Sequence, residues 1–505
     1  MATNGEVNIT ILDGGGSIVV PGANVQLAIG CCSAGTANQL IATTQISALT
    51  AAVGYGPGPE ASALSLAAGG VVLFIKATQN ALGTSTAVAF VGTGTSVITV
   101  TLDGTVGAFD DYSVVFRTAV GGTRGVAGVL FQISFDAGRT FGPNIALGTA
   151  TSYVIPNTGI TLNFAAGTFV ALDTAKFTTT APSWTAAGIQ SALNAFASSA
   201  YASAGVGTMH IVGASVSTAG AFRGAAGADC TSIQGYLDTL VTQFSYNRAI
   251  VSLRDSLAPT AFSGAGETDA TWTGVITADV AAVSAKRICA VGGYYNTQSQ
   301  IPTSVAGAPK YRRPLAWSLA ARQVTIPTQR HAGRVRDGSL SFIVQDPVND
   351  PRDGFNYHDD ALSPTLDVAR LTSARQRKGL PGFYITNPRL LSPAGSDFDL
   401  LPKGLVMDVA CTVVHQAGQI SINDDLRTNS NGTLYGPDAI TIQNGILTKL
   451  KDATVAKSMC SAVGVVVDQT NNVQDTSSVN IAVTVQGKAY VLEEQVTIGF
   501  GSVAA

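Results

Sequence analysis

Between residues 85 and 180 the chain repeats short β-branched runs that are separated by glycine-containing turns. Val97–Leu102, Tyr112–Phe116 and Val129–Phe135 are such runs, and Gly121-Gly122 and Asp136–Gly138 are turns between them. Short strands at a spacing of about ten residues are typical of a small sandwich or barrel. We therefore predict an inserted, β-rich outer domain over residues 85–182.

The sequence on both sides of this module has a different pattern, in which apolar strands alternate with helical segments. Val25–Ile29 and Gly70–Lys76 precede the module, and the second run is apolar on both faces, as a buried strand is. Trp184–Tyr201 follows as a helix with Ser183 as its expected N-cap. Further segments continue the alternation, with strands at Met209–Val212, Ala249–Leu253 and Arg287–Val291 and helices at Cys230–Phe244 and Ala270–Ala285. This order predicts one α/β middle domain made of residues 21–84 and 183–325.

Residues 326–505 are predicted to form a C-terminal inner domain. Asp438–Lys457 has the pattern of an amphipathic helix, and its lysines Lys449, Lys451 and Lys457 lie at the end where cations favour the helix dipole. Other segments predict a helix within Leu362–Lys378, a strand at Gly382–Thr386, and a strand or short helix at Leu405–Val414. The predicted fold class is therefore multidomain α/β (α+β) with nested domains.

Both ends of the chain alternate strictly between apolar and polar residues. The apolar positions are Val7, Ile9 and Ile11 in an N-terminal arm, residues 1–20, and Val479, Ile481, Val483 and Val485 in a terminal strand arm, residues 478–500. Such alternation predicts extended strands with one buried face and one solvated face. Two interpretations remain open: each end pairs within its own subunit, or it is donated to the sheet of a neighbour.

The chain has few charges for a protein that is not disordered. Only 12% of its 505 residues are charged and its net charge is −3, whereas globular proteins have about 25% charged residues. High hydrophobicity excludes disorder, and no apolar run is long enough for a membrane helix, so we expect no membrane insertion. We also expect no secretory signal in Met1–Asp13. A surface this neutral favours a subunit that associates with others.

Basic residues are concentrated between residues 286 and 389, where 15 Lys and Arg accompany seven Asp. A nucleic-acid surface would combine such a patch with recurring aromatic residues, and this pattern is absent. Contacts with partner proteins are therefore the favoured interpretation, and no nucleic-acid partner is predicted.

Signals of catalysis are weak. The four histidines are dispersed, and no G-x-S-x-G elbow or phosphate-binding glycine motif occurs. Asp346, Asp350, Asp353, Asp359 and Asp360 form an acidic cluster beside His358, but their spacing does not fit a calcium loop, so a solvated loop is expected. The six cysteines include no C-x-x-C pair and are predicted to be reduced and buried. We predict no enzyme, no metal and no cofactor.

Several segments resemble the contractile-tail sheath proteins of tailed bacteriophages and related injection machines. Val25–Gly35 resembles the family's opening strand and turn, Asn38–Thr44 and Ala51–Gly56 resemble the segment after it, and Gly69–Ala77 resembles the next strand. Trp272, Val291–Gly293 and the general pattern of Arg377–Lys457 are also similar to the family. Residues 85–180, where such proteins vary, depart from it.

The resemblance implies a subunit of a helical homo-oligomer of stacked rings in a phage tail, assembled in the host cytoplasm. Its partners would be further copies of itself, a tail tube protein, and baseplate and tail terminator proteins. The terminal arms would complete the sheets of neighbours, and Lys449, Lys451 and Lys457 would face the tube. Two alternatives remain: another virion protein of the neck or baseplate, or a β-rich carbohydrate-binding adhesin or enzyme.

Overall fold

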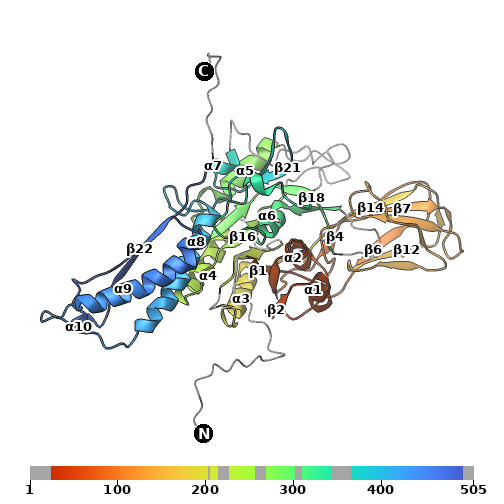
Figure 1. The fold of residues 1–505 in the computed structure, drawn as a ribbon. Helices are drawn as coiled ribbons and strands as arrows, with labels where there is room; N and C mark the ends of the chain where they lie inside the picture. The colour runs from red at the N-terminus through yellow and green to blue at the C-terminus, as the bar shows by residue number, and fades with distance from the viewer. Residues whose placement is uncertain are drawn as a thin grey trace, which may run out of the picture.

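The protein is elongated, with a β-rich body at one end, a helix-covered sheet in the middle and a long helical arm at the other end (Figure 1). This computed structural model describes residues 24–202, 205–213, 227–255, 269–301, 310–343 and 365–492. Its class is mixed α/β with several separate sheets. The N-terminal arm, residues 1–20, lies outside the described residues.

A six-stranded sheet forms the middle of the molecule, in the order β17-β16-β15-β1-β3-β2. Five of its strands run parallel, and β2 is antiparallel to β3. Every residue of β1, β15, β16 and β17 is buried, which is why these strands read as apolar runs. The strands are β1 (Val25–Gly30), β2 (Leu40–Thr43), β3 (Val71–Lys76), β15 (Thr208–Ile211), β16 (Ala249–Ser252) and β17 (Ile288–Val291).

Six helices pack around this sheet. Helices α2 and α6 contact each other as well as the parallel strands, and α3 packs against α4. The helix bounds are α1 (Ile46–Val53), α2 (Pro57–Ala67), α3 (Ala186–Ala197), α4 (Gly227–Thr242), α5 (Asp269–Ala281) and α6 (Leu315–Gln323). The predicted N-cap of α3 is wrong by two residues: Thr185 caps the helix, and its side chain accepts a hydrogen bond from the Gly188 N–H.

The strands β4 to β14 lie between β3 and β15 in the chain and pair only with one another in the described structure. One sheet has the order β10-β9-β7-β14-β4 with β5 also on β14, a second has the order β11-β12-β6, and β8 pairs with β13. Stacked phenylalanines fill the space between them, with Phe116 and Phe131 5.0 Å apart. The bounds are β4 (Thr84–Ser85), β5 (Ala89–Val91), β6 (Ile98–Leu102), β7 (Ser113–Val120), β8 (Gly122–Thr123), β9 (Leu130–Ser134), β10 (Ile145–Ala146), β11 (Ser152–Ile155), β12 (Ile160–Phe164), β13 (Thr168–Phe169) and β14 (Thr174–Thr180).

After β17 and apart from α6, the chain forms small elements on the middle sheet and then the long arm. Leu405–Val414 is helical, because it lies inside α8, and the helix expected within Leu362–Lys378 is a single turn followed by a strand. The elements are β18 (Tyr294–Gln298), β19 (Lys310–Pro314), the 3-10 turn η1 (Val335–Asp337), α7 (Thr365–Val368), β20 (Ala374–Arg377), β21 (Leu380–Ile385), α8 (Leu401–Gly418), the 3-10 turn η3 (Gln419–Ser421), α9 (Gly436–Leu450), the π-helical turn η4 (Lys451–Val455), β22 (Ala462–Val467), α10 (Val473–Thr476) and β23 (Ile481–Gln486).

Apolar residues from Ile326 to Leu405 share the core of the middle sheet, whereas the arm has its own core around α8, α9 and β22. The domain bounds predicted from the sequence, including 326–505 for the inner domain, remain predictions. None of the helices in the described ranges is long and apolar enough to cross a membrane.

Candidate functional site

The arm carries a two-stranded sheet made of β22 and β23. The strands pair antiparallel over six residues, from Ala462 opposite Gln486 to Val467 opposite Ile481. Ile481, Val483 and Val485 pack with the apolar cluster of α8 and α9, while the residues between them are exposed. Among the described residues, neither outer edge of this sheet has a third strand. Since two strands alone are only marginally stable in water, the sheet depends on the helices and has room for further strands.

A groove with a mixed polar and apolar lining lies where β23 ends over α8. It has a volume of about 490 Å³, and its lining includes Met407 of α8, Met459 and Val485 together with the charged Asp397, Lys403 and Lys488. Methionine side chains adapt to irregular partners, so two of them in one groove favour a surface that accepts an apolar segment. The groove and the open sheet edges form the candidate assembly site.

The predicted arm residues fall into two groups. Val7, Ile9 and Ile11 lie outside the described residues. Val479, Ile481, Val483 and Val485 lie in or next to β23 and face the arm's own core, and β23 pairs with β22 of the same chain. The structure thus shows pairing within the subunit for this strand, and exchange between subunits stays a prediction.

Lys449, Lys451 and Lys457 are exposed at the core-proximal end of α9 and its π-helical extension. The carbonyl of Lys457 accepts a hydrogen bond from the side chain of Gln329 at 3.5 Å, which joins this end of the arm to the middle of the molecule. In the described parts of the chain, none of the three ammonium groups has an ion-pair partner. Their predicted contact with a tube is untested.

A buried ion cluster fixes the arm to the middle sheet. Asp408 Oδ1 of α8 accepts hydrogen bonds from Arg248 Nη2 at 3.1 Å and from Arg287 Nη1 at 3.2 Å. Asp408 Oδ2 lies 2.8 Å from Arg248 Nε, and both arginines are under 10% exposed. Burial lowers the pKa of Arg248, and the charge of Asp408 opposes this effect. A Cβ on Gly404 would overlap the Arg248 guanidinium, so only glycine lets α8 come this close. Buried ion pairs between Asp408 and the two arginines therefore hold the arm against the middle sheet.

A second buried ion pair connects the β-rich body to the middle. Arg313 Nη2 of β19 lies 2.8 Å from Asp110 Oδ2, and both side chains are 4% exposed. Glu60 of α2 lies in the same pocket, and burial raises the pKa of both carboxyl groups against the attraction of Arg313. Tyr311, two residues earlier, packs in the phenylalanine core of the β-rich body. These contacts lie across residues about 200 positions apart in the chain, which no local sequence pattern reveals.

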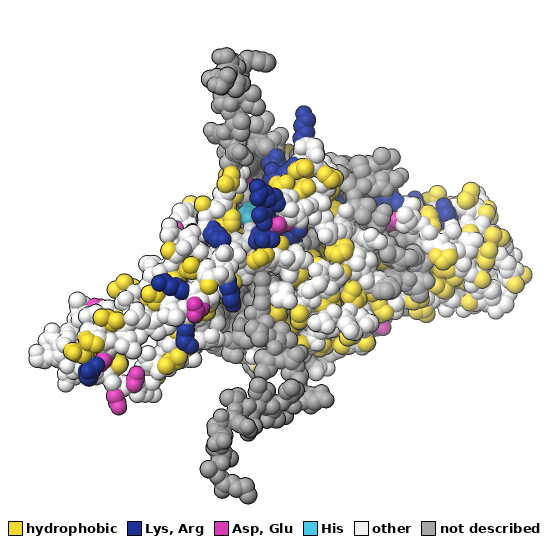
Figure 2. Space-filling model, viewed as in Figure 1, with side chains coloured by type: hydrophobic (Ala, Val, Ile, Leu, Met, Phe, Trp, Pro, Cys, Tyr) yellow, Lys and Arg dark blue, Asp and Glu magenta, His cyan; other side chains and the backbone are white. Residues whose placement is uncertain are grey.

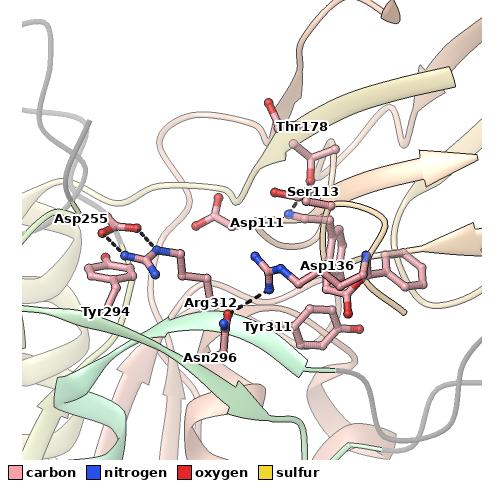
Figure 3. Close-up of a pocket in the computed structure, with 14 residues that line it drawn as sticks. Asp111, Ser113, Asp136, Thr178, Asp255, Tyr294, Asn296, Tyr311 and Arg312 are labelled. Atoms are coloured by element: carbon pink, nitrogen blue, oxygen red, sulfur yellow. Dashed lines mark hydrogen bonds and ion pairs between the residues drawn. The ribbon is translucent and has the colours of Figure 1, made fainter. Parts of the chain in front are cut away.

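A polar cavity of about 200 Å³ opens beside this joint (Figure 3). Arg312 binds both oxygens of Asp255, at 2.6 and 3.0 Å, and Arg139 donates to Asn296 at 3.5 Å. Asp136 is held by its own turn, where it accepts from the Thr140 N–H and hydroxyl. The charged groups Arg312, Arg139 and Asp136 are thus engaged in contacts within the protein. We interpret the cavity as part of the contact between the β-rich body and the middle of the molecule.

Groups suited to chemistry are not brought together in the described ranges. No three His, Cys, Asp or Glu side chains there could hold a metal ion. His210 is fully buried, and burial lowers its pKa to about 3, whereas His415 stacks on Phe244 at the end of α8. All six cysteines are free, and burial raises the pKa of Cys31 and Cys32 to about 12. The cluster of Asp346, Asp350, Asp353, Asp359, Asp360 and His358 lies outside the described residues.

The fold is mixed α/β with several separate sheets, and its arm carries the candidate assembly site. The chain belongs to the DUF2586 family, whose N-terminal domain model matches residues 4–389. No curated protein matches it.

Among solved structures, the chain is similar to tail sheath proteins along nearly its full length. A sheath tail protein from Listeria innocua is 12% identical, with a TM-score of 0.42, and the alignment covers 93% of this chain and 95% of that one. A sheath tail protein from Desulfitobacterium hafniense is 8% identical, with a TM-score of 0.43 and coverage of 96% and 100%. The contracted helical sheath of the anti-feeding prophage is 10% identical, with a TM-score of 0.46 and coverage of 99% of both chains.

Proposed function

We propose that this chain is the structural subunit of a bacteriophage contractile tail sheath, which polymerises around a tail tube and contracts to drive the tube through the host envelope. The observation that carries the proposal is the β22–β23 sheet, which has no third strand on either edge among the described residues and has a groove partly lined by apolar side chains beside one end. An open edge accepts a strand from another chain through main-chain hydrogen bonds, and pockets select alternate side chains.

The strand to be added is the N-terminal arm of a neighbouring copy. Val7, Ile9 and Ile11 would face α8 and α9, in the same way as Ile481, Val483 and Val485 do. An arm of about eight residues reaches about 26 Å, which is enough to cross a subunit boundary. Each net hydrogen bond would contribute about 0.5–1.5 kcal/mol, so the arms keep subunits connected while each subunit moves as a rigid body.

The partners of such a subunit would be further copies in stacked rings, the tube, and baseplate and terminator proteins, in a virion tail. Lys449, Lys451 and Lys457 would face an acidic tube and be released on contraction. Reversing all three charges is expected to abolish binding to the tube but to leave self-assembly without the tube intact.

The polymer itself is tested by negative-stain microscopy and sedimentation of the purified chain. We expect tubes or rings, and we expect removal of residues 1–12 to abolish them without changing the melting temperature. Two double variants of the arm make a sharper comparison. Assembly should be prevented by Val7→Asp with Ile9→Asp, on the apolar face. It should be retained with Asn8→Asp and Thr10→Asp, on the solvated face. Monomers that bind glycans would instead support the adhesin alternative and refute the proposal.

A further inference from the structure

Two groups stand out among the basic residues of the segment from 286 to 389. Arg287, Arg312, Arg313 and Arg389 each pair with an aspartate inside the molecule. Six others collect on one surface, which we call the basic patch: Arg330, Arg334, Arg336, Arg375, Arg377 and Lys378.

The basic patch is formed by η1 and the β20–β21 hairpin lying side by side. The Leu340 N–H donates to the Phe383 carbonyl at 2.8 Å, which places the segment after η1 along β21. Asp337 is the acidic residue of this surface, and it already contacts Arg330 and Arg334 at 3.5 and 3.3 Å. Burial and the neighbouring Arg375 lower the pKa of Arg377, as crowded like charges do. The patch thus has a strong positive excess.

The opposite charge gathers at the far end of the arm, which we call the acidic tip: Asp424, Asp425, Asp468 and Asp475. The Gln474 N–H donates to the Gly432 carbonyl at 3.2 Å, so the turn with Asp468 and Asp475 packs on the loop that follows Asp424 and Asp425. In the described parts of the chain none of these four carboxylates has an ion-pair partner. Figure 2 shows dark blue side chains above the middle of the molecule and, at the end of the arm, magenta side chains with dark blue beside them. Arg427 in this region is paired with Asp438 at 2.6 Å.

The two surfaces cannot neutralise each other within one chain. Helix α8, with 18 residues, separates the tip from the middle by about 27 Å, which is several times the screening length of about 8 Å at physiological salt. Contacts between different surfaces of identical subunits are heterologous and generate rings or helical filaments.

We propose that the basic patch of one copy binds the acidic tip of a second copy, head to tail. This contact rests on the proposed self-assembly and adds an electrostatic interface, distinct from the strand arms, that sets the register of neighbouring subunits. Nucleic acid fits the patch less well, because the two aromatic residues on this hairpin, Phe383 and Tyr384, are buried and offer no stacking surface.

The test uses the full chain and two reversed variants whose changed residues are free of ion pairs in the described structure. Patch-reversed protein carries Arg336→Glu and Lys378→Glu, and tip-reversed protein carries Asp424→Lys and Asp425→Lys. Self-association is measured by analytical ultracentrifugation at 50, 150 and 500 mM NaCl. Lys286→Glu, an exposed charge outside both surfaces, is the matched control.

Each reversed variant alone should associate at least about tenfold more weakly than the wild type, because attraction becomes repulsion at several contacts. An equimolar mixture of the two variants should regain association, because the reversed patch of one variant is acidic and the reversed tip of the other is basic. The control should behave as the wild type, and 500 mM NaCl should weaken the wild type.

Three results would overturn the inference. The first is a wild type that associates while both variants do so within twofold of it, which leaves the proposed function standing. The second is a mixture that stays dissociated. The third is a labelled 20-mer DNA that binds the wild type at 150 mM NaCl and loses binding on patch reversal, which assigns the patch to nucleic acid. A wild type that never associates refutes the proposed function as well.

Discussion

The histidine at the centre of the middle sheet is expected to make the protein sensitive to acid. His210 lies in β15 between Ala28 of β1 and Ile250 of β16, and its side chain is 0% exposed. Neither ring nitrogen has a hydrogen-bond partner in the described structure. Burial without a partner lowers the pKa of His210 from 6.5 to about 3.

The sign of the effect follows from proton binding. In the unfolded chain His210 binds a proton below pH 6.5, whereas in the folded chain it binds one only near pH 3. The free energy of unfolding therefore falls as the pH falls from 6.5 toward 3. At pH 4.5, two pH units below 6.5, the loss is about 2.7 kcal/mol at about 1.36 kcal/mol per unit.

The assay compares the wild type with His210→Leu, a side chain of similar size that does not titrate. Urea unfolding is followed by tryptophan fluorescence, because Trp184, Trp272 and Trp317 all lie in the core of the middle sheet. We expect the wild type to lose about 2.7 kcal/mol more than the variant between pH 7.5 and pH 4.5.

Other groups titrate in the same range, but they cancel in the comparison. The raised pKa of the buried Asp110 carboxyl acts in the opposite direction, since protonation at low pH then favours the folded state, and it acts equally in both proteins. An equal loss of stability in wild type and His210→Leu would refute the reasoning.

Two further predictions concern single contacts. Asp408→Ala removes the carboxylate that faces the buried Arg248 and leaves Arg287 with Asp238 at 3.4 Å, so it should lower the free energy of unfolding by about 3–5 kcal/mol. The exposed Asp452→Ala should change the free energy of unfolding by less than about 0.5 kcal/mol, and urea titration separates these outcomes. Thr185→Ala should lower the free energy of unfolding by about 1 kcal/mol, because the α3 cap is lost. Ser183→Ala, at the N-cap expected from the sequence, should leave the free energy of unfolding unchanged. Equal effects of the two variants on the melting temperature would contradict the assignment of the cap.

The periodic segments of the sequence predicted much of the local structure correctly. The runs at Met209–Val212 and Ala249–Leu253 form β15 and β16, and the amphipathic segment after Asp438 forms α9, because burial on both faces or on one face leaves a direct pattern in the residues. Segments with weak patterns were missed or misjudged. Leu405–Val414 looked ambiguous because it packs on both the middle sheet and the arm, so its helix is apolar on several sides.

The sequence alone determined the types of the strongly periodic elements, the scarcity of charge and the absence of catalytic motifs, because these depend on residue identity and spacing. Only the tertiary structure decided where the charges go. It paired Arg313 with Asp110 and Arg248 with Asp408 across 160 residues or more. In the described residues it left an excess of positive charge on the basic patch and an excess of negative charge on the acidic tip. The physical reason is that a charge's partner is set by distance in space, and chain folding brings together residues whose separation in sequence carries no periodic signal.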